Sequence, residues 1–169
     1  MNKPLVEMFL YNAWANRRLF SACASLTDEQ LDARIQGVSG SVRELFLHIA
    51  GGQQTLVLRT KGRQNEGELQ RWSAWPGFEK LLEIVEQTSQ ELIAAADVLD
   101  DDAEIDLPYQ GEYYRFPVRF FLVHALAHGI EHRTEVKIAL GHMGIQTPDL
   151  DGWPYSAAAG YGQKREDPV

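Results

Sequence analysis

The sequence has a single cysteine among its 169 residues, Cys23, which cannot close an intrachain disulfide or build a thiolate metal cluster. Basic residues are the minority, 16 Lys and Arg against 24 Asp and Glu, and the formal charge of -8 argues against a nucleic-acid binder. About 18 consecutive apolar residues would be needed to cross a membrane, and neither such a run nor a signal-type stretch in residues 1–10 is present. We therefore expect one cytoplasmic domain over residues 1–169, in which any metal site uses His and carboxylate ligands.

Apolar residues recur at helical spacing in four long segments, which predicts helices over residues 4–25, 42–61, 76–98 and 117–141. Thr27-x-x-Gln30 and Ser41-x-x-Glu44 have the form of capping boxes, and the first predicts a further short helix. Pro76 and Pro117 suit the first turns of their helices. Four long helices joined by polar links predict an all-α fold, an antiparallel four-helix bundle.

The remaining segments are connections. Residues 62–75 are polar and contain glycine, so we expect them to cross one end of the bundle. Residues 105–116 indicate a loop or a small hairpin, and residues 156–159 a short extra helix. The helix over 117–141 has apolar residues around most of its circumference, which predicts burial on most sides.

Three of the five histidines, His124, His128 and His132, follow one another at four-residue spacing. Random placement would give on the order of 0.1 pair at this spacing among five histidines. Because four residues is slightly more than one helical turn, all three side chains lie along one stripe. Two imidazoles a turn apart can hold one divalent cation, and the spacing leaves open which two of the three do so.

His48 is the candidate for a third ligand from another helix. Three imidazoles leave one coordination position of the cation open for water or substrate. Gly51-Gly52 follows His48, and two glycines inside a helix are costly unless a neighbouring helix or a site approaches the backbone closely. On its own, a histidine on an apolar face is more often a hydrogen-bonded core residue.

A competing motif overlaps this stripe, since residues 128–132 match the H-x-x-E-H string of inverted zinc peptidases, in which the glutamate is the general base. That alternative requires an acidic third ligand in place of His48. Glu131 otherwise occupies a solvated or salt-bridged position.

Three strings together resemble the DinB-like, or YfiT-like, superfamily of metal-dependent hydrolases. They are Tyr-Asn-Ala-Trp-Ala-Asn at residues 11–16, Val-Arg-Glu-Leu-Phe-Leu-His-Ile at 42–49, and the histidine stripe followed by Arg-Thr-Glu-Val at 133–136. The end of the chain, with Gly144, Pro148 and Asp151, is also similar to that family. Where the family continues His-Arg-Gly-Gln, this chain has His-Arg-Thr-Glu, which affects substrate contacts rather than the ligands.

The resemblance implies a four-helix bundle, in most cases a homodimer, with one divalent metal, nickel or zinc, held by His48, His128 and His132. His124 would then lie behind the ligands. Characterised members include transferases and isomerases that use low-molecular-weight thiols as cosubstrates. The implied function is that of a metal-dependent thiol transferase or hydrolase acting on a small molecule, and the alternative is a non-catalytic stress-response bundle with a structural metal.

Further residues are candidates for supporting roles, each with an ordinary structural alternative. Glu44, Asn12 or Asn16 could accept a hydrogen bond from a ligand imidazole, although Glu44 also fits the capping box. Tyr11, Trp14, Asn16 and Trp153 could wall a substrate pocket. Glu131 and Asp151 are the carboxylates considered for proton transfer, and Glu131, Glu135 or His124 could close the fourth coordination position.

Overall fold

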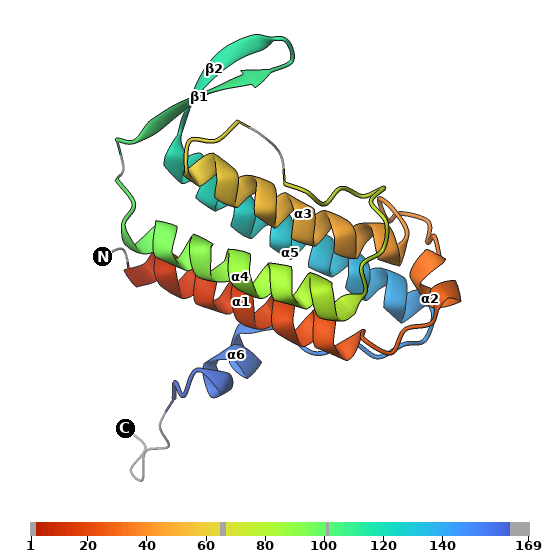
Figure 1. Cartoon of the computed structure of the whole chain (residues 1–169). Helices are drawn as coiled ribbons and strands as arrows, with labels where there is room; N and C mark the ends of the chain where they lie inside the picture. The colour runs from red at the N-terminus through yellow and green to blue at the C-terminus, as the bar shows by residue number, and fades with distance from the viewer. Residues whose placement is uncertain (1–2, 65–66, 101, 163–169) are drawn as a thin grey trace, which may run out of the picture.

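The structure is a computed structural model that describes residues 3–64, 67–100 and 102–162. It contains the helices α1 (Lys3–Ala22), α2 (Asp28–Asp32), α3 (Val42–Thr60), α4 (Phe78–Asp97), α5 (Val118–His142) and α6 (Gly152–Ala158), and the strands β1 (Glu104–Tyr109) and β2 (Glu112–Pro117). The four long helices form a bundle from which the hairpin projects (Figure 1). The predicted helical bundle with a small hairpin is thereby confirmed. None of the described helices is long and apolar enough to span a membrane.

Helix starts follow the local sequence closely. Both capping boxes form, with Thr27 and Gln30 at α2 and Ser41 and Glu44 at α3. The start predicted at Pro76 is wrong. Gly77 adopts a positive φ of 88°, which is not helical, and α4 begins at Phe78. The last helix begins at Gly152 rather than Ser156, since the Asp151 side chain accepts from the Trp153 N–H at 3.0 Å and caps it.

The connection between α3 and α4 differs from the prediction that it crosses one end of the bundle. It runs back along α3 (Figure 1), where the Gly67 N–H donates to the Thr55 hydroxyl and the Arg71 side chain donates to the Ser39 carbonyl oxygen. As a result, α4 starts at the same end as α3 and runs parallel to it. The antiparallel pairs are α3 with α5 and α1 with α4.

Two apolar clusters form the core. The first surrounds Phe46, which packs edge-on against Phe20 at 4.8 Å between ring centroids, and it includes Cys23. Burial raises the pKa of the Cys23 thiol to about 12, so this side chain is an inert core residue. The second cluster lies at the end of the bundle near the hairpin and includes Phe9, Leu92 and Leu122.

A layer of buried polar residues separates these clusters along each long helix. It consists of Asn12, Asn16, Gln53, Thr88, Ser89 and Arg133, and we call it the polar layer. The Arg133 guanidinium donates to the side-chain oxygens of Asn12 at 2.7 Å and Asn16 at 2.6 Å. Gln53 accepts from both asparagine amides and donates to Thr88 and Ser89. The layer joins all four helices from within.

The hairpin turns at Gln110-Gly111, whose φ angles of 52° and 86° are both positive, as a two-residue hairpin loop requires. Ile105 and Leu107 of β1 are buried against the bundle. The expectation that α5 is buried on most sides is wrong, because Val123, Ile130 and Ile138 are 60%, 49% and 46% exposed. Since α3 and α1 cover α5 from two sides only, its outer face remains open.

Candidate metal centre

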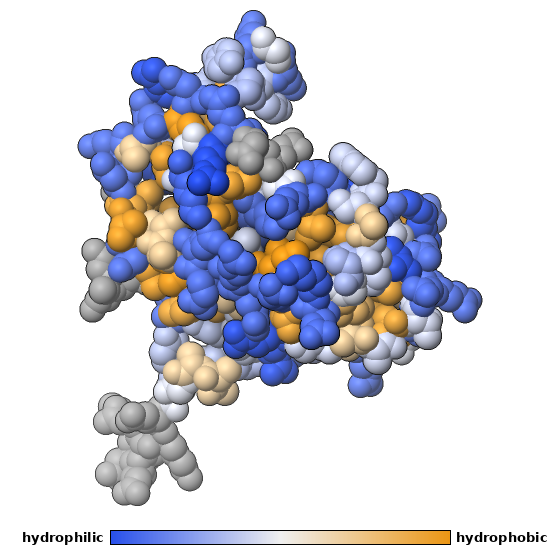
Figure 2. Space-filling view, viewed as in Figure 1, coloured by the Kyte–Doolittle hydropathy of each residue, from blue (hydrophilic) through white to orange (hydrophobic). Residues whose placement is uncertain are grey.

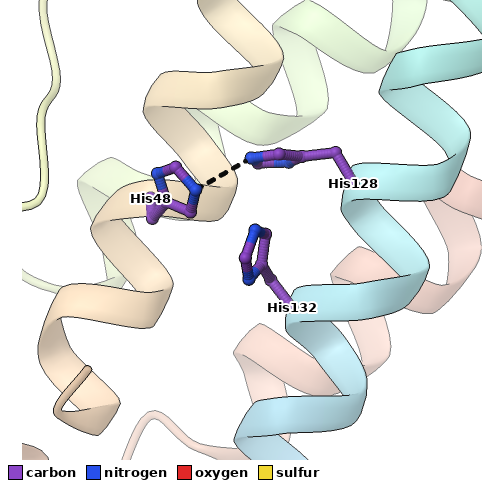
Figure 3. Close-up of side chains that lie close together, drawn as sticks. All are labelled: His48, His128 and His132. Carbon is purple, nitrogen blue, oxygen red and sulfur yellow. Dashed lines mark hydrogen bonds between the residues drawn. The ribbon is translucent and has the colours of Figure 1, made fainter. Parts of the chain in front are cut away.

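His48 of α3 faces His128 and His132 of α5 (Figure 3). One ring nitrogen from each lies within 4.8 Å of the others, and the Nε2 atoms of His48 and His128 are 3.1 Å apart. The antiparallel packing of α3 on α5 causes this meeting, since it places one position of α3 opposite two successive turns of α5. In the part of the chain that the structure describes, no other histidine, cysteine or carboxylate joins this group.

The two glycines after His48 make the close approach possible. A Cβ atom on Gly52 would overlap the imidazole of His128, and one on Gly51 would overlap the carbonyl oxygen of Leu69. Gly51 therefore leaves space for the returning connection, and Gly52 leaves space for the imidazole of His128. Both outcomes confirm the prediction of a close backbone approach at this point.

Two of the imidazoles, those of His48 and His128, are held in their neutral form. Burial, together with the charges of Arg71 and His132, lowers the pKa of His48 to about 4. Burial and the neighbouring His132 and His48 lower the pKa of His128 to about 3. Neutral imidazole is the form that ligates metal ions, because its unprotonated nitrogen carries a free lone pair.

Glu135 fixes the orientation of His132. Its carboxylate accepts from the Nδ1–H of His132 at 2.6 Å, which leaves Nε2 as the nitrogen with a free lone pair. Ser39 donates its N–H and its hydroxyl to the same carboxylate, and Arg71 donates to the Ser39 hydroxyl. Burial opposes the charge on Glu135, but the bonds from His132 and Ser39 outweigh it and lower the pKa of this carboxyl.

A cavity of about 330 Å³ opens beside the histidines. It is lined by His48 and His128, by Gly51 and Gly52, and by Leu69 and Gln70 of the returning connection. The group of three nitrogens is therefore next to space that a small molecule can enter.

The DinB family model matches residues 1–166 of the chain. The chain belongs to the DinB family. A crystal structure of a DinB-like protein from Bacillus cereus ATCC 10987 is similar in fold, with a TM-score of 0.65 and 17% sequence identity, over 88% of this chain and 99% of that one. No curated protein matches.

In this DinB chain, the residues expected to wall a substrate pocket lie away from the histidine cavity. Tyr11 donates its hydroxyl to the Leu150 carbonyl oxygen and packs against Trp14. Asn16 belongs to the polar layer, and Trp153 is 83% exposed at the start of α6. None of the four lines the cavity beside His48 and His128.

The remaining candidate residues have structural contacts or lie outside the group of three histidines. Glu44 completes the capping box of α3 and pairs with Arg34. Asp151 caps α6, and Glu131 is exposed, outside the group of three histidines, which leaves the peptidase motif without its geometry. His124 is exposed, with its ring centroid 6.0 Å from that of His128, and it lines the cavity.

Sequence reasoning missed the roles of Glu135, Ser39 and Arg71. Glu135 was considered only as a fourth ligand, although its i, i+3 spacing from His132 was a signal for the hydrogen bond that the structure contains. Ser39 and Arg71 precede and follow α3 in loops, and no periodicity links such positions to α5.

Proposed function

We propose that His48, His128 and His132 hold one divalent metal ion and that this site serves a metal-dependent enzyme acting on a small molecule, of the thiol S-transferase or hydrolase class. The observation that carries the proposal is the convergence of three imidazoles beside a cavity, two of which, His48 and His128, have depressed pKa values and line that cavity. The Nε2 atoms of His48 and His128 lie 3.1 Å apart and contact each other, and a cation held by the lone pairs of the three rings would replace this contact.

The donor set fits a metal such as nickel or zinc, because imidazole nitrogen is a preferred ligand of both. When bound, such an ion supplies Lewis acidity that lowers the pKa of a coordinated water or thiol. Glu135 holds the His132 ring in the required tautomer, and Arg71 holds Ser39 against Glu135. Leu69 and Gln70 of the returning connection line the cavity together with His48 and His128.

An open coordination position separates this proposal from a structural metal site, which is closed by a fourth protein ligand. The positions of the three residues that could supply a fourth ligand do not support a closed metal site. Glu131 is exposed, Glu135 is bonded to His132 and Ser39, and His124 lies beside the group without joining it. The cavity beside His48 and His128 supports the catalytic alternative.

Elemental analysis of protein purified without added metal tests the site. We expect close to one metal ion per chain in the wild type and loss of it in His48→Ala, His128→Ala and His132→Ala. The matched controls are His124→Ala and His142→Ala, which lie on the same helix and should keep the metal. Full occupancy in any one of the three ligand variants would contradict the proposed ligand set.

A second measurement addresses catalysis. Cobalt(II) substituted into the site should change its visible spectrum when a low-molecular-weight thiol such as 2-mercaptoethanol is added, because a free position accepts the thiolate. An unchanged spectrum in a fully loaded protein would favour the structural metal.

We also propose that the chain forms a homodimer. The open face of α5, with Val123, Ile130 and Ile138, supports this, since apolar residues grouped on one helix face favour association. Sedimentation equilibrium of the wild type and of Ile130→Glu is the test, with dissociation expected in the variant.

A further inference from the structure

A second cavity, of about 460 Å³, adjoins the histidine cavity at the base of the hairpin. The two share Thr55, Leu56 and His124 in their walls, so they are direct neighbours. Figure 2 shows hydrophobic residues where the hairpin meets the bundle, while the tip of the hairpin is hydrophilic. We call this second cavity the hairpin pocket.

Aromatic rings dominate the hairpin pocket. Phe116 of β2 stacks on Phe120 of α5 with 5.6 Å between ring centroids and an interplanar angle of 21°. The line of rings continues from Phe120 to His124 at 5.8 Å and from His124 to His128 at 6.0 Å. Phe120 is 43% exposed and lines the pocket. Exposed aromatic surface beside a polar site is typical of a ligand pocket.

The histidine cavity and the hairpin pocket differ in charge from the chain as a whole. Neither cavity is lined by an aspartate or glutamate among the described residues, although the chain carries 24 of them and a formal charge of -8. Arg59 of α3 lines the hairpin pocket, and one of its nitrogens donates to the Arg63 carbonyl oxygen at 3.1 Å. In the described ranges, no carboxylate lies within ion-pair distance of Arg59. Its charge is therefore available to an anion.

We infer that the hairpin pocket binds the aryl part of an anionic small molecule, with the anionic group at Arg59 and the rest of the molecule extending past His124 toward His48 and His128. This inference rests on the proposed function, for which it names the substrate class. An aryl ring gains edge and face contacts with Phe116 and Phe120 that an aliphatic ring does not. Because the two cavities share wall residues, the reactive end of such a molecule would lie beside His48 and His128.

Calorimetric titration with 2-naphthoate tests this inference on metal-free protein, so that a bound metal cannot capture the carboxylate. We expect saturable one-to-one binding by the wild type. Neutral 2-naphthamide should bind about tenfold more weakly, because it lacks the charge-assisted contact with Arg59. The saturated analogue decahydro-2-naphthoate should bind about fivefold more weakly, because it lacks the aromatic contacts.

Two variants with matched controls locate the binding. Phe120→Asp places a negative charge, like that of naphthoate, on the wall of the pocket and should abolish binding, while Tyr113→Asp, at a 75% exposed position of β2, should leave it unchanged. Arg59→Gln should remove the preference for 2-naphthoate over 2-naphthamide, and Arg63→Gln should keep it. Phe120 is partly exposed, and circular dichroism checks that Phe120→Asp is folded.

Metal content measured on the same preparations keeps the two proposals distinct. Wild-type protein that binds metal but shows no saturable naphthoate binding would overturn the pocket assignment and leave the metal site standing. Equal binding by folded Phe120→Asp would also overturn it. Loss of the dimer in Phe120→Asp without any naphthoate binding would instead assign this face to a second copy of the chain.

Discussion

His132 and Arg133 are neighbours on α5 and both are buried, at 7% and 2% exposure, yet they belong to two different kinds of polar cluster. Arg133 points into the polar layer, where Asn12 and Asn16 accept from it and Gln53 completes the bonds to α4. His132 points toward α3, where it meets two other imidazoles.

The two clusters differ in what their side chains can bind. The polar layer is satisfied largely by the protein itself, with one guanidinium nitrogen of Arg133 left over, and burial lowers the pKa of Arg133 to about 10. The histidine cluster instead brings together three ring nitrogens, each of which can offer a lone pair to a cation, beside a cavity. The polar layer joins the four helices and stabilises the fold, whereas imidazole nitrogens grouped beside a cavity indicate a binding site.

The largest expected effect comes from breaking the polar layer. Asn16→Leu removes an acceptor of the buried Arg133 charge and a donor to Gln53, so we expect the free energy of unfolding to fall by about 3–5 kcal/mol. Urea unfolding measures this. Arg17→Leu, one position further along α1 in an exposed ion pair, is the control and should change it by less than about 0.5 kcal/mol. A loss below about 1 kcal/mol for Asn16→Leu would mean that the layer contributes little.

Metal binding should stabilise the histidine cluster to a comparable degree. With free zinc or nickel at about a thousand times its dissociation constant, the free energy of unfolding should rise by about 4 kcal/mol. Thermal unfolding with and without metal tests this, and His48→Ala should show no rise. An equal rise in His48→Ala would place the metal elsewhere.

Glu135 provides a finer test of the same cluster. Glu135→Gln weakens the hydrogen bond that orients His132, and we expect about tenfold weaker metal affinity, with about hundredfold for Glu135→Ala. Competition with a chromophoric chelator measures the affinity. Glu131→Gln, at an exposed position one residue before His132, is the control. If the two glutamine variants bind metal equally, the bond to Glu135 does not support ligation.

A further test of the histidine cluster concerns pH. In the metal-free protein the pKa values of His48 and His128 are lowered from 6.5 to about 4 and about 3. Below pH 6.5 these two histidines are therefore protonated in the unfolded chain while they remain neutral in the folded chain. Their contribution to stability is therefore complete above pH 6.5 and is lost as the pH falls toward about 3. Urea midpoints between pH 7 and 4 should fall more steeply for the wild type than for the double variant His48→Gln, His128→Gln. Parallel curves would show that these imidazoles titrate normally.

Several features were predictable because they depend on neighbouring residues. The capping boxes at Thr27 and Ser41 are short-range hydrogen bonds, and the histidine stripe follows from helical periodicity. The pairing of His132 with Glu135 was within reach for the same reason. By contrast, the course of residues 67–71 along α3 depends on the fit of Gly51 to the Leu69 carbonyl oxygen, which no local pattern encodes. The wrong expectation for α5 has a similar origin, since apolar composition does not specify which faces are covered.

The sequence by itself determined where the helices lie and that His124, His128 and His132 share one stripe, because both properties arise within a single helix. Only the tertiary structure decided that His48 meets His128 and His132, while His124 borders the hairpin pocket instead. The physical reason is the register of two antiparallel helices. That register is set by packing across the whole of α3 and α5, including the glycine at position 52 that admits the His128 ring.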